Sequence, residues 1–156
     1  MAGAAPRADY AVLRGLLPEA EKGLVSLGRA ARHPELDRHL LELVDLRASQ
    51  LNGCAYCLQL HVNKARKEGV ASGKLVQVAA WRESPLFSDR ERIALDLTEA
   101  MTRMDPAHGV PDALFEAARR EFGDAALAAL VSKILSINAW NRLMVAYRIT
   151  PPDAEE

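Results

Sequence analysis

Two cysteines and a histidine lie close together in the sequence, at positions 54, 57 and 61. In a helix, spacings of three and four residues place side chains on one face. At the start of a helix, unpaired N–H groups and the positive end of the dipole favour a thiolate. Two thiols at Cys-x-x-Cys spacing can also close a disulfide with little distortion. The segment predicts thiol redox chemistry, in which His61 accepts the proton of Cys57 or stabilises its anion.

An acidic side chain in the preceding segment is a candidate partner for the imidazole. Apolar spacing predicts a helix that ends where Asn52-Gly53 interrupts it. If the chain folds back there as an antiparallel helical hairpin, a residue ten positions before the turn faces one about ten after it. Glu42 would then lie near His61 or Asn63. A carboxylate in that place would orient the imidazole and raise its basicity.

The elements that would position these groups are helical almost throughout, because apolar residues recur at helical spacing. Pro34 suits a first turn, Gly28 and Gly69 suit helix ends, and Ser88 with Glu91 forms a capping-box pattern. No alternating β-branched run indicates a sheet. We expect an all-α protein with one domain over residues 1–150, a core motif at 42–61 and a frayed tail at 151–156. The predicted helices cover about 13–28 (continuing beyond Pro18), 34–51, 54–68, 75–81, 88–104, 115–122 (ending at Gly123) and 125–147.

Composition limits the classes of function. The chain has 156 residues, 49% hydrophobic and 26% charged, which is typical of one globular domain. With 20 basic and 21 acidic residues the net charge is -1, and aromatic residues make up 5%, so neither a basic nucleic-acid binder nor a single-strand reader is indicated. We expect no membrane partner, because the apolar stretch at 125–141 is short and contains Lys133. The expected location is the cytoplasm. The stretch at 125–141 is apolar on most sides, which indicates that other helices or another subunit surround it.

The same residues allow other interpretations. Cys54, Cys57 and His61 could bind zinc with Glu42 or His33, but structural zinc normally uses two separated ligand pairs. A thioredoxin-type motif would need a preceding strand, and buried structural cysteines are a further alternative. Other polar side chains are expected to serve structure or solubility. Asp45, Arg47, His108 and the charge runs at 82–83 and 89–92 are expected to be solvated, and Asn138, Asn141 and Arg142 to satisfy buried backbone or bridge subunits.

The spacing Glu42-x11-Cys54-x-Tyr56-Cys57-x3-His61 resembles the core motif of the AhpD-like alkylhydroperoxidases, within the carboxymuconolactone decarboxylase superfamily. The resemblance extends to residues 87–100 and 137–142, and it covers roughly residues 34–147. It implies an AhpD-like helical bundle that is oligomeric, as a homotrimer or a larger assembly. It also implies antioxidant activity as a thiol peroxidase or disulfide reductase, with no metal or organic cofactor.

The resemblance also implies roles for individual residues. Cys57 would be the peroxidatic thiol, Cys54 the resolving thiol, His61 the proton acceptor and Glu42 part of the proton relay. Tyr56 stands where better-studied members can carry a histidine, and it would either line the substrate pocket or pack. The partners would be a hydroperoxide and a dithiol or lipoyl-protein reductant. Two alternatives stay open: a non-catalytic redox-sensing oligomer, and a decarboxylase-like enzyme acting on a small acid, although the decarboxylases lack the cysteine pair.

Overall fold

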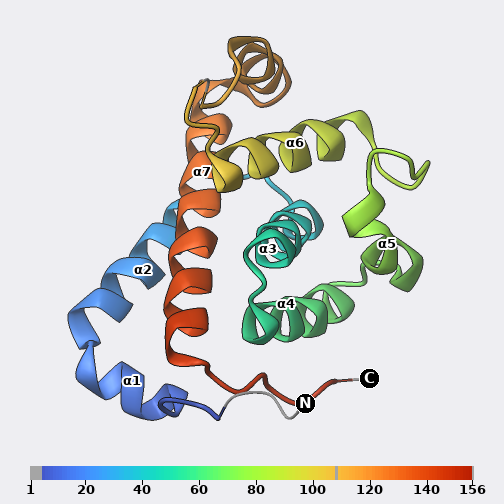
Figure 1. The fold of residues 1–156 in the computed structure, drawn as a ribbon. Helices are drawn as coiled ribbons and strands as arrows, with labels where there is room; N and C mark the ends of the chain where they lie inside the picture. The colour runs from blue at the N-terminus through green and yellow to red at the C-terminus, as the bar shows by residue number, and fades with distance from the viewer. Residues whose placement is uncertain (1–4, 108, 156) are drawn as a thin grey trace.

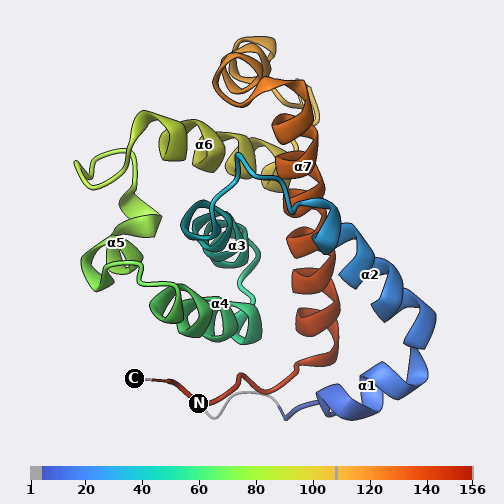
Figure 2. The same cartoon turned by 180° about the vertical axis from the view of Figure 1, so that it is seen from behind.

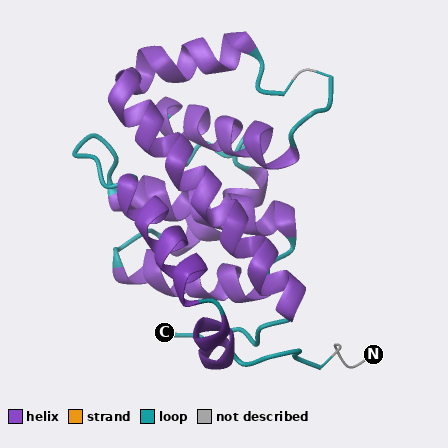
Figure 3. Cartoon of the chain, turned by 90° about the vertical axis from the view of Figure 1, so that its left-hand side faces the viewer, coloured by secondary structure: helices purple, strands orange, loops and turns teal. Residues whose placement is uncertain are grey.

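The computed structural model describes residues 5–107 and 109–155, so the expectation for His108 lies outside the described residues. The described residues form helices and one isolated β-bridge, between Asp105 and Gly109, which confirms the all-α class (Figure 3). The elements are α1 (Tyr10–Leu16), α2 (Pro18–Ala30), α3 (Arg38–Asn52), α4 (Ala55–Lys67), α5 (Ser72–Gln77), the 3-10 turn η1 (Val78–Ala80), α6 (Asp89–Arg103) and α7 (Asp112–Tyr147).

Helix α3 occupies the middle of the molecule, and α4, α6 and α7 pack around it (Figures 1 and 2). Its residues 43–49 are all buried, because neighbours cover it on several sides. The arm formed by α1 and α2 packs on the opposite side of α7 from α3 (Figure 2). The central helix thus carries the residues that the sequence places before the cysteine pair.

Helix α7 is long and kinked. Gly123 has a φ of 73°, in the left-handed region that favours glycine, and the first part of α7 turns away there (Figure 1). The predicted helix end at Gly123 therefore coincides with this kink. Among the described residues, α7 is the helix whose length and hydropathy would suit a membrane span. It packs against α2, α3, α4 and α6, as a core helix of a soluble protein does.

Several helix boundaries differ from the predicted ones. Helix α3 begins at Arg38 and not at Pro34, because the Asp37 side chain accepts a hydrogen bond from the backbone N–H of Leu40 at 2.8 Å and caps the helix. The first predicted segment is broken at Leu17, since the residue before a proline is disfavoured in the helical conformation. Helix α2 then continues past Gly28 to Ala30. The capping box at the start of α6 is confirmed.

The solvated positions assigned to Asp45 and Arg47 were wrong. Asp45 is 0% exposed and Arg47 is 9% exposed. Both lie on α3, and a helix covered on several sides has no solvated face on which to place its charges. The prediction that the charge run at 82–83 is solvated holds only in part, because Arg82 pairs with the buried carboxylate of Glu99 at 2.8 Å.

The C-terminal tail, for which the sequence predicts fraying, lies along α4 and contacts it. Asn63 donates a side-chain hydrogen bond to the backbone carbonyl of Asp153 at 2.8 Å and accepts one from the N–H of Glu155 at 3.2 Å. Arg66 donates to the carbonyl of Glu155 at 2.8 Å. These polar contacts involve residues 153–155 of the tail.

Candidate active site

A tight turn between α3 and α4 places the two cysteines. Gly53 ends α3 in the left-handed conformation with a φ of 65°, and the N–H of Cys54 donates to the carbonyl of Ser49 at 3.0 Å. Cys54 is therefore the N-cap of α4, and its sulfur accepts from the N–H of Cys57 at 3.3 Å. The two cysteines form a disulfide with a Cα–Cα distance of 5.4 Å, in the usual range. The pair predicted to be redox-active is thus bonded at the start of a helix.

The predicted contact between Glu42 and His61 is present. Helices α3 and α4 pack as a hairpin, and His61 Nδ1 lies 2.6 Å from Glu42 Oε2. With the carboxylate oxygen as acceptor, Nδ1 is the donor of this hydrogen bond, and Nε2 is the ring nitrogen that the contact leaves unused. His61 is 6% exposed. The hairpin therefore brings together the acid and the imidazole that the sequence proposed as neighbours.

Two further charged side chains adjoin this pair, and the sequence reading missed their role. Asp45 Oδ2 lies 3.1 Å from His61 Nδ1 and 2.5 Å from the Nζ of Lys133 on α7. Burial alone lowers the pKa of the Lys133 ammonium, but the carboxylates of Asp45 and Glu42 outweigh it and raise that pKa. Lys133 therefore stays charged and neutralises the buried Asp45. The only sequence signal was that Lys133 is the single charged residue of the apolar stretch at 125–141.

A cavity of about 690 Å³ opens beside these groups. Cys57, His61, Glu42 and Lys133 line it, whereas Cys54 does not. Tyr56 lines it as well, as one of its two predicted roles requires, and its ring lies 5.7 Å from that of Tyr10. Burial raises the pKa of the Tyr56 phenol, so the hydroxyl stays protonated and can donate a hydrogen bond. A small molecule in this cavity would meet the sulfur of Cys57 before that of Cys54.

The groups that could hold a cation do not match the zinc interpretation. Among the described residues, Glu42, Asp45 and His61 present ligand atoms that all lie within 4.8 Å of one another, and neither cysteine belongs to this group. The sulfurs are joined in the disulfide, so they are not thiolate ligands. The ammonium of Lys133 already lies against Asp45 and supplies the positive charge there.

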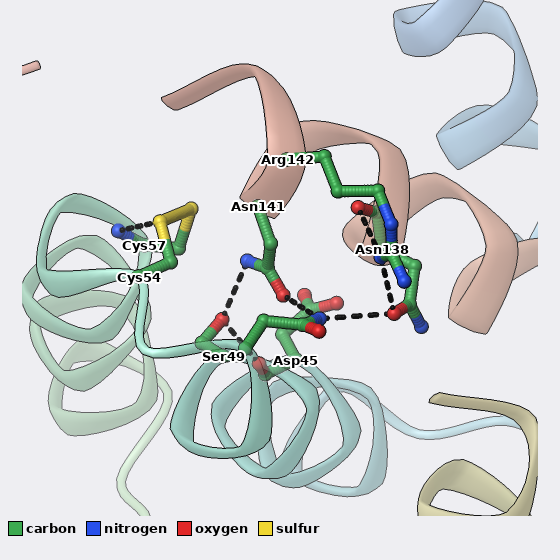
Figure 4. Close-up of a disulfide and its surroundings, with 8 residues drawn as sticks. Asp45, Ser49, Cys54, Cys57, Asn138, Asn141 and Arg142 are labelled. Atoms are coloured by element: carbon green, nitrogen blue, oxygen red, sulfur yellow. Dashed lines mark hydrogen bonds between the residues drawn. A yellow bond between two sulfur atoms is a disulfide. The ribbon is translucent and has the colours of Figure 1, made fainter. Parts of the chain in front are cut away.

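A network of hydrogen bonds between side chains joins the turn before the cysteines to α7 (Figure 4). Asn141, which is 0% exposed, donates to Ser49 Oγ at 3.0 Å and accepts from Asn52 at 2.9 Å. Asn52 also donates to Asn138 at 2.9 Å. Because Ser49 in turn accepts from the N–H of Cys54, the network supports the loop that carries the disulfide. The prediction that these asparagines satisfy buried backbone holds only in part: Asn138 donates to the carbonyl of Ile134 at 2.9 Å, whereas the contacts with Ser49 and Asn52 are between side chains.

We expect Asn141→Ala to destabilise the protein by about 2 kcal/mol, because two buried hydrogen bonds are lost and their partners stay buried. For a chain of this length the melting temperature should fall by roughly 4–8 °C. Thermal unfolding followed by circular dichroism, with the disulfide intact, would measure it. Arg120→Ala is the matched control, since Arg120 is exposed on the same helix, has no hydrogen bond or ion pair among the described residues, and should change the melting temperature little. Equal melting temperatures for both variants would show that the network does not stabilise the fold.

The fold and the site together define an all-helical protein with a redox-type cysteine pair beside a buried histidine–carboxylate pair. Residues 18–100 match the carboxymuconolactone decarboxylase family. The chain is 34% identical over 131 residues to the uncharacterised protein YdfG of Bacillus subtilis, covering 84% of this chain and 88% of that one. It belongs to this family, as an AhpD-like member of the superfamily.

Solved structures agree with this assignment. A protein of unknown function from Agrobacterium tumefaciens, proposed to be the antioxidant defence protein AhpD, is 32% identical and superposes with a TM-score of 0.85 over 96% of this chain and 99% of that one. An uncharacterised peroxidase-related protein from Ralstonia eutropha with an alkylhydroperoxidase AhpD core has the same fold, with a TM-score of 0.77 at 21% identity over 90% of this chain and 75% of that one. At family level, this ancestry and the cysteine pair fit an antioxidant peroxidase.

Proposed function

We propose that this protein reduces hydroperoxides with the thiols of Cys54 and Cys57, with Cys57 as the attacking sulfur. The observation that carries the proposal is that Cys57 and His61 line one cavity and Cys54 does not. The start of α4 favours a thiolate at Cys57, and His61 lies one turn further along the same helix. Cys54 is already within bonding distance to resolve the oxidised sulfur.

The reaction balances without a metal or an organic cofactor. The Cys57 thiolate attacks the outer oxygen of the hydroperoxide and the O–O bond breaks, so that Cys57 becomes a sulfenic acid. The leaving alkoxide takes up the proton that the Cys57 thiol gave up and departs as an alcohol. The Cys54 thiol then condenses with the sulfenic acid, releasing water and forming the disulfide. A dithiol or lipoyl-protein reductant returns both cysteines to thiols by exchange and is itself oxidised to a disulfide.

Proton transfer is assigned to the pair on the hairpin. His61 Nε2 takes the thiol proton of Cys57 and returns it to the leaving alkoxide, while Nδ1 stays hydrogen-bonded to Glu42. Glu42 orients the ring and stabilises the imidazolium that forms, as a carboxylate does in other activated nucleophiles. Asp45 gives the site a second buried carboxyl group beside the ring, and the ammonium of Lys133 lies against it as its ion-pair partner.

Subunit assembly and location are part of the same proposal. Side chains of α7 such as Leu135 and Val145 remain about half exposed in the single chain, at 50% and 46%. Apolar side chains on a long helix are often covered by another subunit. We therefore propose a homotrimer or a larger homo-oligomer, working in the cytoplasm, where low-molecular-weight and protein dithiols keep cysteines reduced.

An oxidant titration tests the proposed chemistry. One equivalent of cumene hydroperoxide added to the reduced protein should remove two hydrogen atoms from its intact mass, because the Cys54–Cys57 disulfide forms. With excess dithiothreitol the protein should consume the hydroperoxide repeatedly. The double variant Cys54→Ser/Cys57→Ser is the control, and it should consume none above background. Disulfide formation without turnover would favour the redox sensor, and a wild-type protein no faster than the double variant would contradict the peroxidase.

A further inference from the structure

The cavity beside Cys57 is positively charged, although the protein as a whole is not. Six basic and three acidic residues line it, whereas the whole chain has 20 basic and 21 acidic residues. Three of the six are already paired: Arg38 with Glu68, Lys67 with Glu155, and Lys133 with Asp45. The local excess of positive charge therefore lies on the remaining three, Arg29, Arg32 and Lys64.

These three cations are unusual within the chain. Among the described residues, five of the 20 basic side chains make neither a hydrogen bond nor an ion pair: Arg29, Arg32, Lys64, Arg120 and Arg148. Three of those five line this one cavity. The negative end of a helix dipole accounts for basic residues near the end of α2 or α4. It does not account for two separate helices that present unpaired cations to the same cavity.

The positions of the three cations suit one ligand. Arg29 lies in the last turn of α2, Arg32 lies two residues beyond the end of that helix, and Lys64 lies on α4, one turn beyond His61. The lining also includes apolar side chains, among them Leu24, Leu60, Ile137, Trp140 and Met144. A volume of about 690 Å³ falls in the range of small-molecule sites. The cavity thus combines a reactive sulfur, apolar side chains and three unpaired cations.

We propose that the substrate is an amphipathic hydroperoxide that carries a carboxylate. This rests on the proposed peroxidase function and specifies which hydroperoxides it acts on. The carboxylate would bind the guanidinium groups of Arg29 and Arg32 and the ammonium of Lys64, the apolar body would contact the lining, and the hydroperoxide would reach Cys57. The unpaired cations then have their counter-ion in the substrate.

A matched pair of substrates tests this. Cumene hydroperoxide bearing a ring carboxylate and the analogue bearing a ring carboxamide have the same reacting group and nearly the same size. With dithiothreitol as reductant, kcat/KM for the carboxylate should exceed that for the carboxamide at least about tenfold at low ionic strength, mainly through KM, and high salt should reduce the preference. In Arg29→Gln/Arg32→Gln the ratio should fall towards one. In Arg120→Gln, which removes an unpaired exposed arginine outside the cavity, it should stay as in the wild type.

The outcomes separate the two proposals. If neither compound is consumed, the peroxidase function itself fails. If both are consumed at equal kcat/KM, the peroxidase stands and the carboxylate preference is overturned. Equal kcat/KM for the two compounds, together with slower reduction of Arg29→Gln/Arg32→Gln by an acidic lipoyl protein, would also overturn it and assign the cations to the reductant. A preference that persists unchanged in the double variant would overturn the roles of Arg29 and Arg32.

Discussion

Cys57→Ser should lose all peroxide reduction, whereas Cys54→Ser should lose turnover and keep the first chemical step. The difference follows from the cavity, which Cys57 lines and Cys54 does not. A serine hydroxyl at position 57 is not ionised near neutral pH and does not attack the hydroperoxide. With serine at position 54 the sulfenic acid of Cys57 has no neighbouring thiol, so it should persist. Intact mass after one equivalent of cumene hydroperoxide should show one added oxygen atom for Cys54→Ser and no change for Cys57→Ser.

The two variants control for each other, because both replace a buried sulfur by an oxygen and both abolish the disulfide. Their melting temperatures should therefore be similar, and loss of structure would not separate them. A dimedone-type probe that reacts with sulfenic acids should label only Cys54→Ser. Oxygen addition to Cys57→Ser instead would reverse the order of the two sulfurs and assign the attack to Cys54.

Much of the site could be predicted because it is local in sequence. The hairpin follows from helical apolar spacing on both sides of Asn52-Gly53, and counting residues away from that turn pairs Glu42 with His61. Cys54 and Cys57 lie within the first turn of α4, where spacing alone fixes their proximity. These groups lie within a segment of 20 residues, so no knowledge of tertiary packing was needed to place them together.

The rest of the site depends on packing that periodicity does not encode. Lys133 reaches Asp45 from another helix, and Asn141 reaches Ser49 across 92 residues of sequence. A polar residue on a helix with one apolar face is normally solvated, but α3 is covered on several sides, so Asp45 and Arg47 are buried. The helices that surround α3 decide which side chains pair with its buried charges. The sequence pattern does not specify which helices these are.

A second buried charge cluster lies away from the cysteines, and the free energy of unfolding should fall markedly when one of its partners is removed. Glu99 on α6 is 3% exposed. Its Oε1 accepts from Arg47 Nε at 2.7 Å and from the indole N–H of Trp81 at 2.8 Å, and its Oε2 accepts from Arg82 at 2.8 Å and Arg103 at 3.1 Å. Arg47 is itself buried on the central helix, so Glu99 joins α3, α6 and the segment after η1. Removing its charge would leave the Arg47 guanidinium buried without a counter-ion.

We expect Glu99→Gln to destabilise the protein by about 3 kcal/mol near neutral pH and to lower its melting temperature by roughly 6–12 °C. Glutamine keeps the shape and one acceptor oxygen, so the loss reports mainly on charge. Asp96→Asn is the matched control: Asp96 also pairs with Arg82, but its side chain is 43% exposed, and the change should be below about 1 kcal/mol. Equal losses in the two variants would contradict a special contribution from burial.

The same cluster fixes how stability should depend on pH. Burial alone would raise the pKa of Glu99, but the hydrogen bonds from Trp81, Arg82 and Arg47 outweigh it and lower that pKa from 4.5 to about 2. Because the folded protein holds the carboxylate charged more strongly than the unfolded chain, its contribution is complete above about pH 4.5 and disappears as the pH falls towards 2. The difference in melting temperature between wild type and Glu99→Gln should therefore be constant from about pH 6 to 7 and shrink below about pH 4.5. A difference that stayed the same down to about pH 2.5 would show that the glutamine acts through shape and not through charge.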